Sequence, residues 1–241
     1  MDKKDFTELL NKIFEQNGLS DLLNEEKSEK FYKLSSILIE TNKLFNLTAI
    51  TDEKGIILKH FADSVTIARF IPENSTLIDV GCGAGFPSLP IAIIRNDVKI
   101  TSLDSTAKKI NFINSTAKEL ELDNIVAITA RAEDFAKANR EKFDVSTSRA
   151  VARLNILDEL CLPLTKRDGL FIAMKSSRGE EEYNEAKRGI SKLGANLLQI
   201  SSITLNNDDE SLDREIYVFK KCSAAPIQYP RNYSQICKKP L

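Results

Sequence analysis

The sequence has few of the residues that bind metal ions or form disulfides. It contains one histidine, His60, and four cysteines, none of which form a CxxC pair: Cys82, Cys161, Cys222 and Cys237. This spacing argues against a structural zinc site and against a disulfide framework. We therefore expect no bound metal.

Long apolar runs and an excess of one charge are also missing. The run LPIAII (89–94) is far too short to span a bilayer, and the N-terminus lacks the apolar core of a signal peptide. We therefore expect a cytoplasmic protein with no membrane partner. The 34 basic residues balance 35 acids, which argues against sequence-independent coating of nucleic acid. Charge is nevertheless uneven, because the chain after Phe219 has basic residues and no acid.

Two kinds of hydrophobic pattern divide the chain. Apolar residues recur at helical spacing in residues 6–14 and again in 34–44. Seven short β-prone runs follow, most of them separated by helical patterns: 76–80, 98–103, 124–129, 143–148, 169–175, 197–205 and 215–221. Such alternation predicts a parallel sheet covered by helices on both faces. The polar stretch NNDDES before the last run suits a hairpin, in which the last strand would run antiparallel.

The same change of pattern predicts the domain organisation. A chain of 241 residues is long enough for a large α/β core with a smaller extension. We expect an N-terminal helical extension (1–70) packed on a core (71–222), followed by a basic C-terminal tail (223–241).

The stretch LIDVGCGAGFPSLP (77–90) places three glycines on alternate positions directly after a predicted strand. Glycine there permits a positive φ or the close approach of a ligand to the backbone. A dinucleotide fingerprint would need a third glycine where Phe86 stands, and a phosphate loop would need G-K-[ST]. With Asp79 before it, the G-x-G-x-G pattern resembles motif I of the S-adenosylmethionine-dependent methyltransferases.

Acids at the next two strand ends support a nucleoside site. Asp104 ends the second strand, where a carboxylate can accept both ribose hydroxyls. Glu133 and the backbone of Ala132 follow the third strand and are placed to hold the adenine edge. A single acid of this kind is more often a helix cap or a turn residue. Three elements in register at strand ends, however, predict a cofactor site.

The segment after the fourth strand argues against two classes of methyl acceptor. Methyltransferases of the adenine amino group carry [DNS]-P-P-[YF] there, whereas this chain has STSRAVARL. Enzymes that methylate pyrimidine carbon use a cysteine in a loop. Cys161 lies instead in the apolar stretch LDELCLPL, which predicts a buried helical residue.

Segments along nearly the whole chain together resemble the RsmG (glucose-inhibited division protein B) family: NLTAI (46–50), KHFADS (59–64), DVGCGAGFPSLPIAI (79–93), LDSTAKKINFI (103–113), RAEDF (131–135), SRAVA (148–152) and YPR…KKPL (229–241). The resemblance implies a Rossmann-like, seven-stranded class I methyltransferase sheet. It also implies methyl transfer from S-adenosylmethionine to N7 of one guanine in bacterial 16S ribosomal RNA. It matches Gly81, Phe86, Ala132, Glu133 and Arg149 to cofactor-contact positions, to which the strand-end argument adds Gly83 and Asp104.

A guanine N7 acceptor suits the residues present. N7 has an in-plane lone pair and no proton, so direct in-line attack needs alignment and no general base. We therefore name no catalytic residue and expect no nucleophilic cysteine, Ser–His pair or paired carboxylates. A base recognised in this way is usually turned out of an RNA loop or bulge.

Polar and basic positions near the predicted site are candidates for holding the RNA. The substrate-side candidates are Asn46, His60, Arg149 and Lys175, and the RNA-binding candidates are Arg149, Arg153, Lys175, Arg231, Lys238 and Lys239. We expect Arg149 and Arg153 to lie one helical turn apart, where a guanidinium can stack on a base or bind phosphate. Structural roles stay open: surface charge for Arg153, packing for His60, a turn for Asn46 and a disordered tail.

The expected partner is 16S ribosomal RNA or the small ribosomal subunit, bound by a monomer. A small-molecule or protein methyltransferase with a closed apolar pocket stays open, as does a cofactor-binding assembly factor without turnover. A dehydrogenase is a more distant alternative, and it would require a nicotinamide cofactor.

Overall fold

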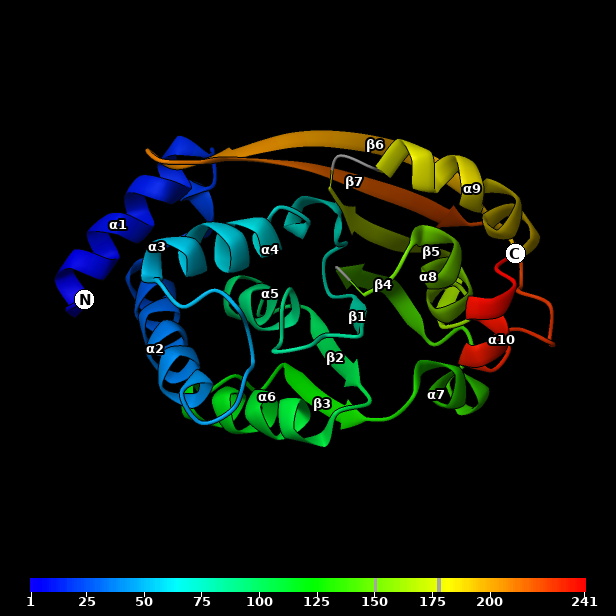
Figure 1. Cartoon of the computed structure of the whole chain (residues 1–241), viewed down its shortest axis with the longest axis horizontal. Helices are drawn as coiled ribbons and strands as arrows, with labels where there is room; N and C mark the ends of the chain where they lie inside the picture. The colour runs from blue at the N-terminus through cyan, green and yellow to red at the C-terminus, as the bar shows by residue number, and fades with distance from the viewer. Residues whose placement is uncertain (150, 177–178) are drawn as a thin grey trace.

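The computed structural model describes residues 1–149, 151–176 and 179–241, and these form a seven-stranded sheet in the order β3-β2-β1-β4-β5-β7-β6 (Figure 1). The strands are β1 (Thr76–Val80), β2 (Lys99–Asp104), β3 (Ile125–Thr129), β4 (Phe143–Arg149), β5 (Thr165–Lys175), β6 (Ala195–Asn206) and β7 (Ser211–Lys221). Strands β1 to β5 pair in parallel, whereas β7 is antiparallel to both of its neighbours. The predicted sheet and its antiparallel last hairpin are therefore confirmed.

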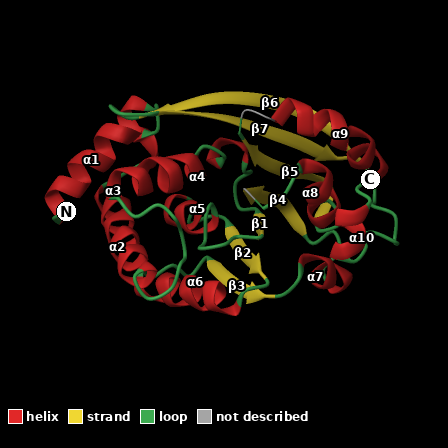
Figure 2. Ribbon diagram, viewed as in Figure 1, coloured by secondary structure: helices red, strands yellow, loops and turns green. Residues whose placement is uncertain are grey.

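Helices cover both faces of this sheet (Figure 2). They are α1 (Lys3–Gln16), η1 (Ser20–Leu22), α2 (Glu25–Asn42), α3 (Glu53–Gly55), η2 (Ile56–Ala62), α4 (Asp63–Val65), η3 (Ala68–Phe70), α5 (Ser88–Ile94), α6 (Ala107–Glu119), α7 (Ala132–Ala138), α8 (Leu154–Cys161), α9 (Gly179–Lys192) and α10 (Tyr233–Lys238). Successive residues of β1 enter different cores, because side chains alternate between the faces of a strand. Leu77 packs with the N-terminal helices, and Ile78 packs with α8.

The N-terminal helices pack on the sheet through apolar stripes. The Asp2 carboxylate caps α1 by accepting from the Asp5 N–H, and Phe6, Leu10 and Phe14 on one side of α1 are buried. Because their cluster also contains sheet residues, the extension shares a core with the rest of the chain. The expected helical role of Leu44 is wrong: α2 ends at Asn42, and Leu44 is 82% exposed.

The β6–β7 hairpin reaches along one side of the molecule to the N-terminal helices (Figure 1). At its tip, Asp208 accepts from Lys12 Nζ at 2.5 Å, and Asn206 N donates to Asn17 Oδ1 at 2.7 Å. Glu210 forms an ion pair with Lys59 of η2 at 2.7 Å. The hairpin therefore ties the extension to the far edge of the sheet.

The C-terminal tail is ordered and packs beside α7 and α8. Ile236 of α10 is fully buried in the same cluster as α8. Arg140 binds the carbonyl oxygens of Ala225, at 2.7 Å, and of Tyr229. A disordered tail is therefore excluded, while the division of the chain at residues 70 and 222 stays a prediction.

Candidate functional site

The turn after β1 has a backbone conformation that favours glycine, and one of its glycines faces open space. Gly81 and Gly83 have φ values of 74° and 58°, in the left-handed region that favours glycine. A Cβ on Gly81 would lie 2.5 Å from Val151 Cγ2, whereas a Cβ on Gly83 would meet nothing within 4 Å. The backbone at Gly83 therefore faces open space that a ligand can fill.

Asp79 connects the end of β1 to the start of α5. Its buried Oδ2 accepts from the Ser88 N–H at 3.3 Å, and burial raises the pKa of this carboxyl to about 7. The helix α5 begins at Ser88, with Pro87 as its N-cap.

A pocket of about 200 Å³, called here the nucleoside pocket, lies at the ends of β1, β2 and β3. Asp104, Ala132 and Glu133, which the strand-end argument groups together, all line it, as does Gly81, which the family resemblance matched to a cofactor contact. Gly83 lines the neighbouring pocket instead. The Asp104 carboxylate accepts from Gly83 N at 3.1 Å and from Thr106 N at 2.8 Å, one bond to each oxygen. Since a carboxylate oxygen can accept two hydrogen bonds, Asp104 keeps acceptor capacity for hydroxyl groups.

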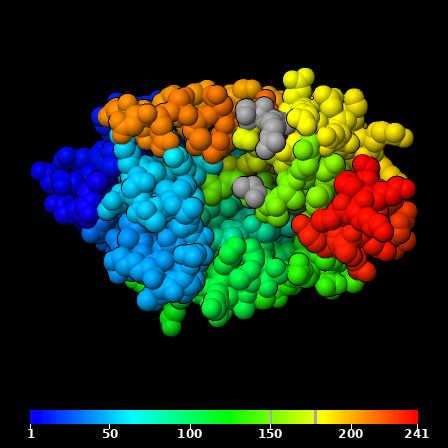
Figure 3. All heavy atoms as spheres, in the orientation of Figure 1, coloured from blue at the N-terminus to red at the C-terminus, as the bar shows by residue number. Residues whose placement is uncertain are grey.

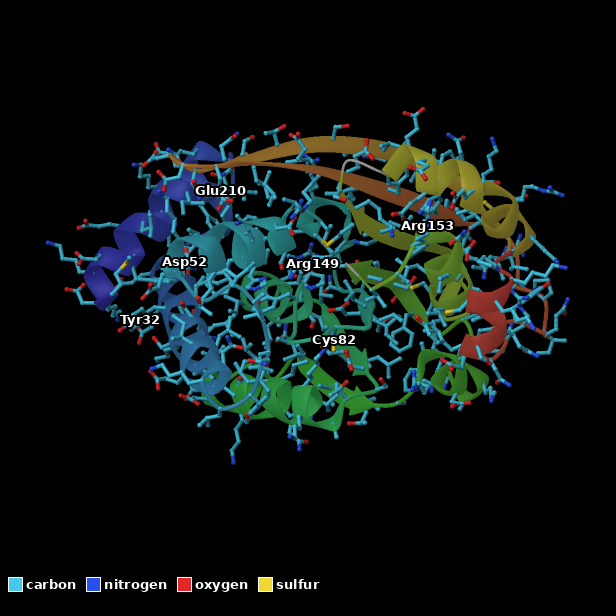
Figure 4. All side chains as sticks on the ribbon, viewed as in Figure 1. Tyr32, Asp52, Cys82, Arg149, Arg153 and Glu210 are labelled. Atoms are coloured by element: carbon cyan, nitrogen blue, oxygen red, sulfur yellow. The ribbon has the colours of Figure 1, made fainter. Side chains whose placement is uncertain are left out.

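A middle pocket of about 300 Å³ adjoins the nucleoside pocket and shares Gly81, Asp104 and Val151 with it. Phe86, His60 and Arg149 line its other side, together with Gly83, Cys82 and Lys109. Cys82 and Arg149 lie near the centre of the molecule, between the N-terminal helices and α8 (Figure 4). Burial keeps the pKa of the Cys82 thiol far above its usual range, so this thiol stays protonated.

His60 is held as a neutral ring. Its imidazole stacks on Phe86 with centroids 4.4 Å apart, and its Nε2 lies 2.8 Å from Thr48 Oγ1. Arg149 Nη2 lies 3.3 Å from Nδ1, and because a guanidinium only donates, Nδ1 accepts and carries no proton. Burial, and secondarily the Arg149 charge, lower the pKa of His60 to about 3.

Arg149 is fixed by the N-terminal extension. Its Nη1 donates to Asp63 Oδ2 at 2.9 Å and to the Lys59 carbonyl at 2.8 Å. The other Asp63 oxygen accepts from Arg214 Nε of β7 at 3.0 Å, and the Asp63 side chain is only 2% exposed. One buried carboxylate therefore holds guanidinium groups from two strands, and it orients Arg149 along the middle pocket.

An outer pocket of about 520 Å³ continues from the middle pocket and shares His60, Arg149 and Val151 with it. Basic side chains from five elements or their ends line this outer pocket: Lys59, Arg149, Arg153, Lys175 and Arg214. The space-filling view shows a hollow on this face between the N-terminal helices and α8 (Figure 3). The three pockets thus adjoin one another along the carboxyl ends of the strands, where ligands bind in open α/β sheets. They are together called the cleft.

The expected helical spacing of Arg149 and Arg153 is wrong. Arg149 is the last residue of β4, and Arg153 is the N-cap of α8; Ala150 between them lies outside the described residues. Arg153 forms ion pairs with Glu181 at 3.2 Å and Glu185 at 2.7 Å on α9. The two arginines reach the cleft from different elements, because β4 ends before the chain turns into α8.

The other RNA candidates occupy different environments. Lys175 ends β5 as predicted, is 7% exposed and binds both Glu182 and the Ala152 carbonyl at 2.7 Å. Arg231 forms an ion pair with Glu159 at 2.6 Å. Asn46, Lys238 and Lys239 are exposed, and none of them is among the described residues that line the three pockets.

Several site residues were not among the predicted ones. Thr48 and Arg214 hold His60 and Asp63, and Tyr233 lines the nucleoside pocket. Asp63 had a usable signal, since it follows His60 by three positions and therefore shares a helical face with it. Among the described residues, no three His, Cys, Asp or Glu side chains gather as a metal site requires.

Comparisons with known proteins show the family to which the chain belongs. A family model described as rRNA small subunit methyltransferase G matches residues 27–213. A protein named ribosomal RNA small subunit methyltransferase G from Staphylococcus carnosus (strain TM300) is 44% identical over 224 residues, which cover 91% of this chain and 92% of the relative. A protein of the same name from Clostridium botulinum (strain Eklund 17B / Type B) is 42% identical over 98% of this chain and 99% of its own.

Solved structures show the same fold at low sequence identity. A precorrin-6y C5,15-methyltransferase from Geobacter metallireducens GS-15 superposes with a TM-score of 0.54 at 13% identity, covering 74% of this chain and 92% of that chain. TYW2 from M. jannaschii, solved in complex with AdoMet, also has a TM-score of 0.54, at 15% identity, with 72% and 79% coverage. None of the described helices has the length and apolarity needed to cross a bilayer.

Proposed function

Because the chain belongs to the rRNA small subunit methyltransferase G family, we propose that it transfers a methyl group from S-adenosylmethionine to N7 of one guanine in 16S ribosomal RNA. The observation that carries this proposal is that three pockets adjoin one another through shared lining residues. The nucleoside pocket joins a middle pocket, and Arg149 lies on the boundary between that middle pocket and the basic outer pocket. A donor and an acceptor can therefore bind side by side within one chain, which supports action as a monomer.

The inner part of the cleft suits the donor. The open space over Gly83 leaves room for a ligand to approach the backbone, and Asp104 offers acceptors for ribose hydroxyls. Glu133 and Ala132 line the end of the pocket where an adenine edge would lie. S-adenosylmethionine supplies an electrophilic methyl group on a positively charged sulfur.

The outer part of the cleft suits a nucleotide acceptor. Lys59, Lys175 and Arg214 surround it, and cations of this kind bind phosphate oxygens and base edges. Five basic and two acidic side chains line this pocket, which favours RNA over the closed apolar pocket of a small-molecule enzyme. Arg149 lies where the acceptor base would meet the donor, and its side chain is oriented by Asp63 before any ligand binds.

The chemistry follows from how the site holds the two reactants. The lone pair of N7 forms a bond to the methyl carbon while the carbon–sulfur bond breaks and sulfur keeps the electron pair. No proton leaves N7, so no general base is required. The state of His60 agrees with this, because its ring is neutral and both nitrogens are engaged by Thr48 and Arg149. Catalysis then comes from alignment within a preorganised site.

The test is transfer of a tritiated methyl group to small subunits that lack their native guanine-N7 methylation. Borohydride–aniline cleavage then maps the product. We expect label at one cleavable guanine. Label at another atom would keep the enzyme class and overturn the N7 assignment. Cofactor binding without label on subunits or free 16S RNA would favour an assembly factor without turnover.

A further inference from the structure

The C-terminal tail supplies a wall of the nucleoside pocket. Tyr233, the first residue of α10, lines this pocket with Gly81, Asp104 and Glu133. Of the described residues that line the pocket, Tyr233 is the one with an aromatic ring. The sequence separates Tyr233 from Glu133 by 100 positions, but Tyr233 N donates to Glu133 Oε1 at 3.3 Å. Tyr233 is half-buried, packs on the cluster that contains Ile236 and also lines the pocket, so part of this residue is available to a ligand.

The position of Tyr233 is fixed from both sides. Before it, Arg231 binds the fully buried Glu159 through its backbone N at 2.7 Å and through Nε and Nη2 at 2.9 and 2.6 Å. After it, Ile236 packs into the core. Glu159 is followed directly by Leu160, which itself lines the nucleoside pocket. The anchor of the tail and a wall of the pocket therefore belong to one turn of α8.

The contact with Tyr233 also changes the expected role of Glu133. Its side chain is 8% exposed, and one carboxylate oxygen already accepts the Tyr233 N–H. Glu133 therefore connects the tail to the start of α7 as well as lining the pocket. A ligand that reaches Glu133 also meets the ring of Tyr233.

We propose that Tyr233 is a cofactor-binding residue, whose ring packs against the adenine of S-adenosylmethionine, and that the Arg231–Glu159 pair positions it. This inference rests on the proposed function, since it needs an adenine in the nucleoside pocket. A tyrosine ring offers an adenine both apolar area and a π-face, and removing one such ring costs about tenfold in affinity.

The test is isothermal titration of the full-length chain with S-adenosylhomocysteine. Tyr233→Ala is expected to bind about tenfold more weakly than the wild type, and Tyr233→Phe is expected to restore binding because it keeps the ring. Gln235→Ala, an exposed change on the same short helix, is the matched control and should bind as the wild type does. In the methylation assay, Tyr233→Ala should raise the KM for the donor while kcat at saturating donor and the KM for RNA stay unchanged.

A spectroscopic readout separates contact with adenine from support of the fold. The chain has no tryptophan and five tyrosines, so tyrosine emission can be observed directly. S-adenosylhomocysteine should quench this emission in the wild type and quench it less in Tyr233→Phe, which still binds. If Tyr233→Ala unfolds, Tyr233→Leu, which keeps apolar packing, replaces it in the same titration.

The outcomes separate this inference from the proposed function. Equal affinity of Tyr233→Ala or Tyr233→Leu and the wild type, or equal quenching in Tyr233→Phe, overturns the role of Tyr233 and leaves the methyltransferase proposal intact. A wild type that binds no S-adenosylhomocysteine overturns the donor assignment itself, and the inference with it.

Discussion

The imidazole of His60 lies flat on the ring of Phe86, with the two planes only 7° apart. Phe86 belongs to the turn after β1, and His60 belongs to η2 of the N-terminal extension. The stack therefore joins the glycine turn to the extension at the middle pocket. It also buries the ring, which explains why His60 stays uncharged.

The pKa of His60 predicts a specific dependence of stability on pH. The folded pKa of about 3 lies below the ordinary value of 6.5, so between these values the unfolded chain binds more protons. The stabilising contribution is complete above about pH 6.5 and is lost as the pH falls, by at most about 1.4 kcal/mol per pH unit. Urea unfolding should therefore show a steeper loss of stability between pH 6.5 and 4 in the wild type than in His60→Gln.

The difference between the two proteins isolates this one group. Burial raises the pKa of Asp79 to about 7 and of Asp158 to about 8, which gives slopes of the opposite sign. Both carboxyls are present in the wild type and in His60→Gln, so their contributions cancel. Identical slopes would show that His60 is not buried as a neutral ring.

Removing the Asp63 charge should damage both stability and activity. Asp63→Asn leaves two guanidinium groups, of Arg149 and Arg214, without their buried carboxylate, which costs about 3 kcal/mol. Arg149 also loses its orientation at the boundary of two pockets, so kcat should fall at least tenfold. The measurements are urea unfolding at pH 7 and steady-state methylation.

Arg153→Ala is the control for the unfolding measurement. Its ion pairs with Glu181 and Glu185 join side chains that are at least 42% exposed, so unfolding should change by less than about 1 kcal/mol. If Asp63→Asn lowered the free energy of unfolding as little as Arg153→Ala does, the buried Asp63 carboxylate would not organise the cleft.

Two basic residues of the tail, Arg231 and Lys239, should have different roles: the first in stability and the second in RNA binding. Arg231→Met leaves the buried charge of Glu159 unpaired and should cost about 3–5 kcal/mol in the free energy of unfolding. The double variant Glu159→Gln/Arg231→Met should recover part of that loss. Lys239→Met, at an exposed position, should leave stability unchanged and reduce the salt slope of RNA binding by about one ion. A stable Arg231→Met protein with weakened RNA binding would contradict this division.

The glycines of the turn provide a test of where the ligand lies. Gly81→Ala would place a methyl group 2.5 Å from Val151 and should lower stability and cofactor affinity together. The methyl group of Gly83→Ala would meet open space, so the free energy of unfolding should fall by only about 1–2 kcal/mol, the cost of an alanine with a left-handed backbone. Its affinity for S-adenosylhomocysteine should nevertheless fall more than tenfold. If a folded Gly83→Ala protein kept the affinity of the wild type, the ligand would have to bind elsewhere than at this turn.

Most of the sheet was predictable because its signals are local. The run at 76–80 has the same bounds as β1, and Asp104 ends β2 as expected, since short apolar runs and turn residues define such strands. Parallel strand ends meet at one edge, so the nucleoside pocket could be assembled from Gly81, Asp104 and Glu133 without coordinates.

The parts that were not predicted depend on long-range packing. No local pattern links Tyr233 to Glu133 or Arg231 to Glu159, because these contacts arise from where the tail packs against α7 and α8. Leu44 continues a helical spacing in the sequence, but the Asn42 side chain accepts from Leu47 N and Thr48 N and turns the chain out of α2. The helical spacing expected for Arg153 failed for a similar reason, since a strand extends up to Arg149.

The tip of the β6–β7 hairpin also limits which segments can be exchanged between members of this family in chimaeric proteins. Lys12, Asn17 and Lys59 of the extension each bind a residue between Asn206 and Glu210. In a chimaera with the N-terminal extension of another family member, the extension would therefore lack matching partners at the hairpin tip, on the far edge of the sheet. The transferable module is the extension together with residues 206–210, two pieces of chain that are distant in sequence and form one contact surface.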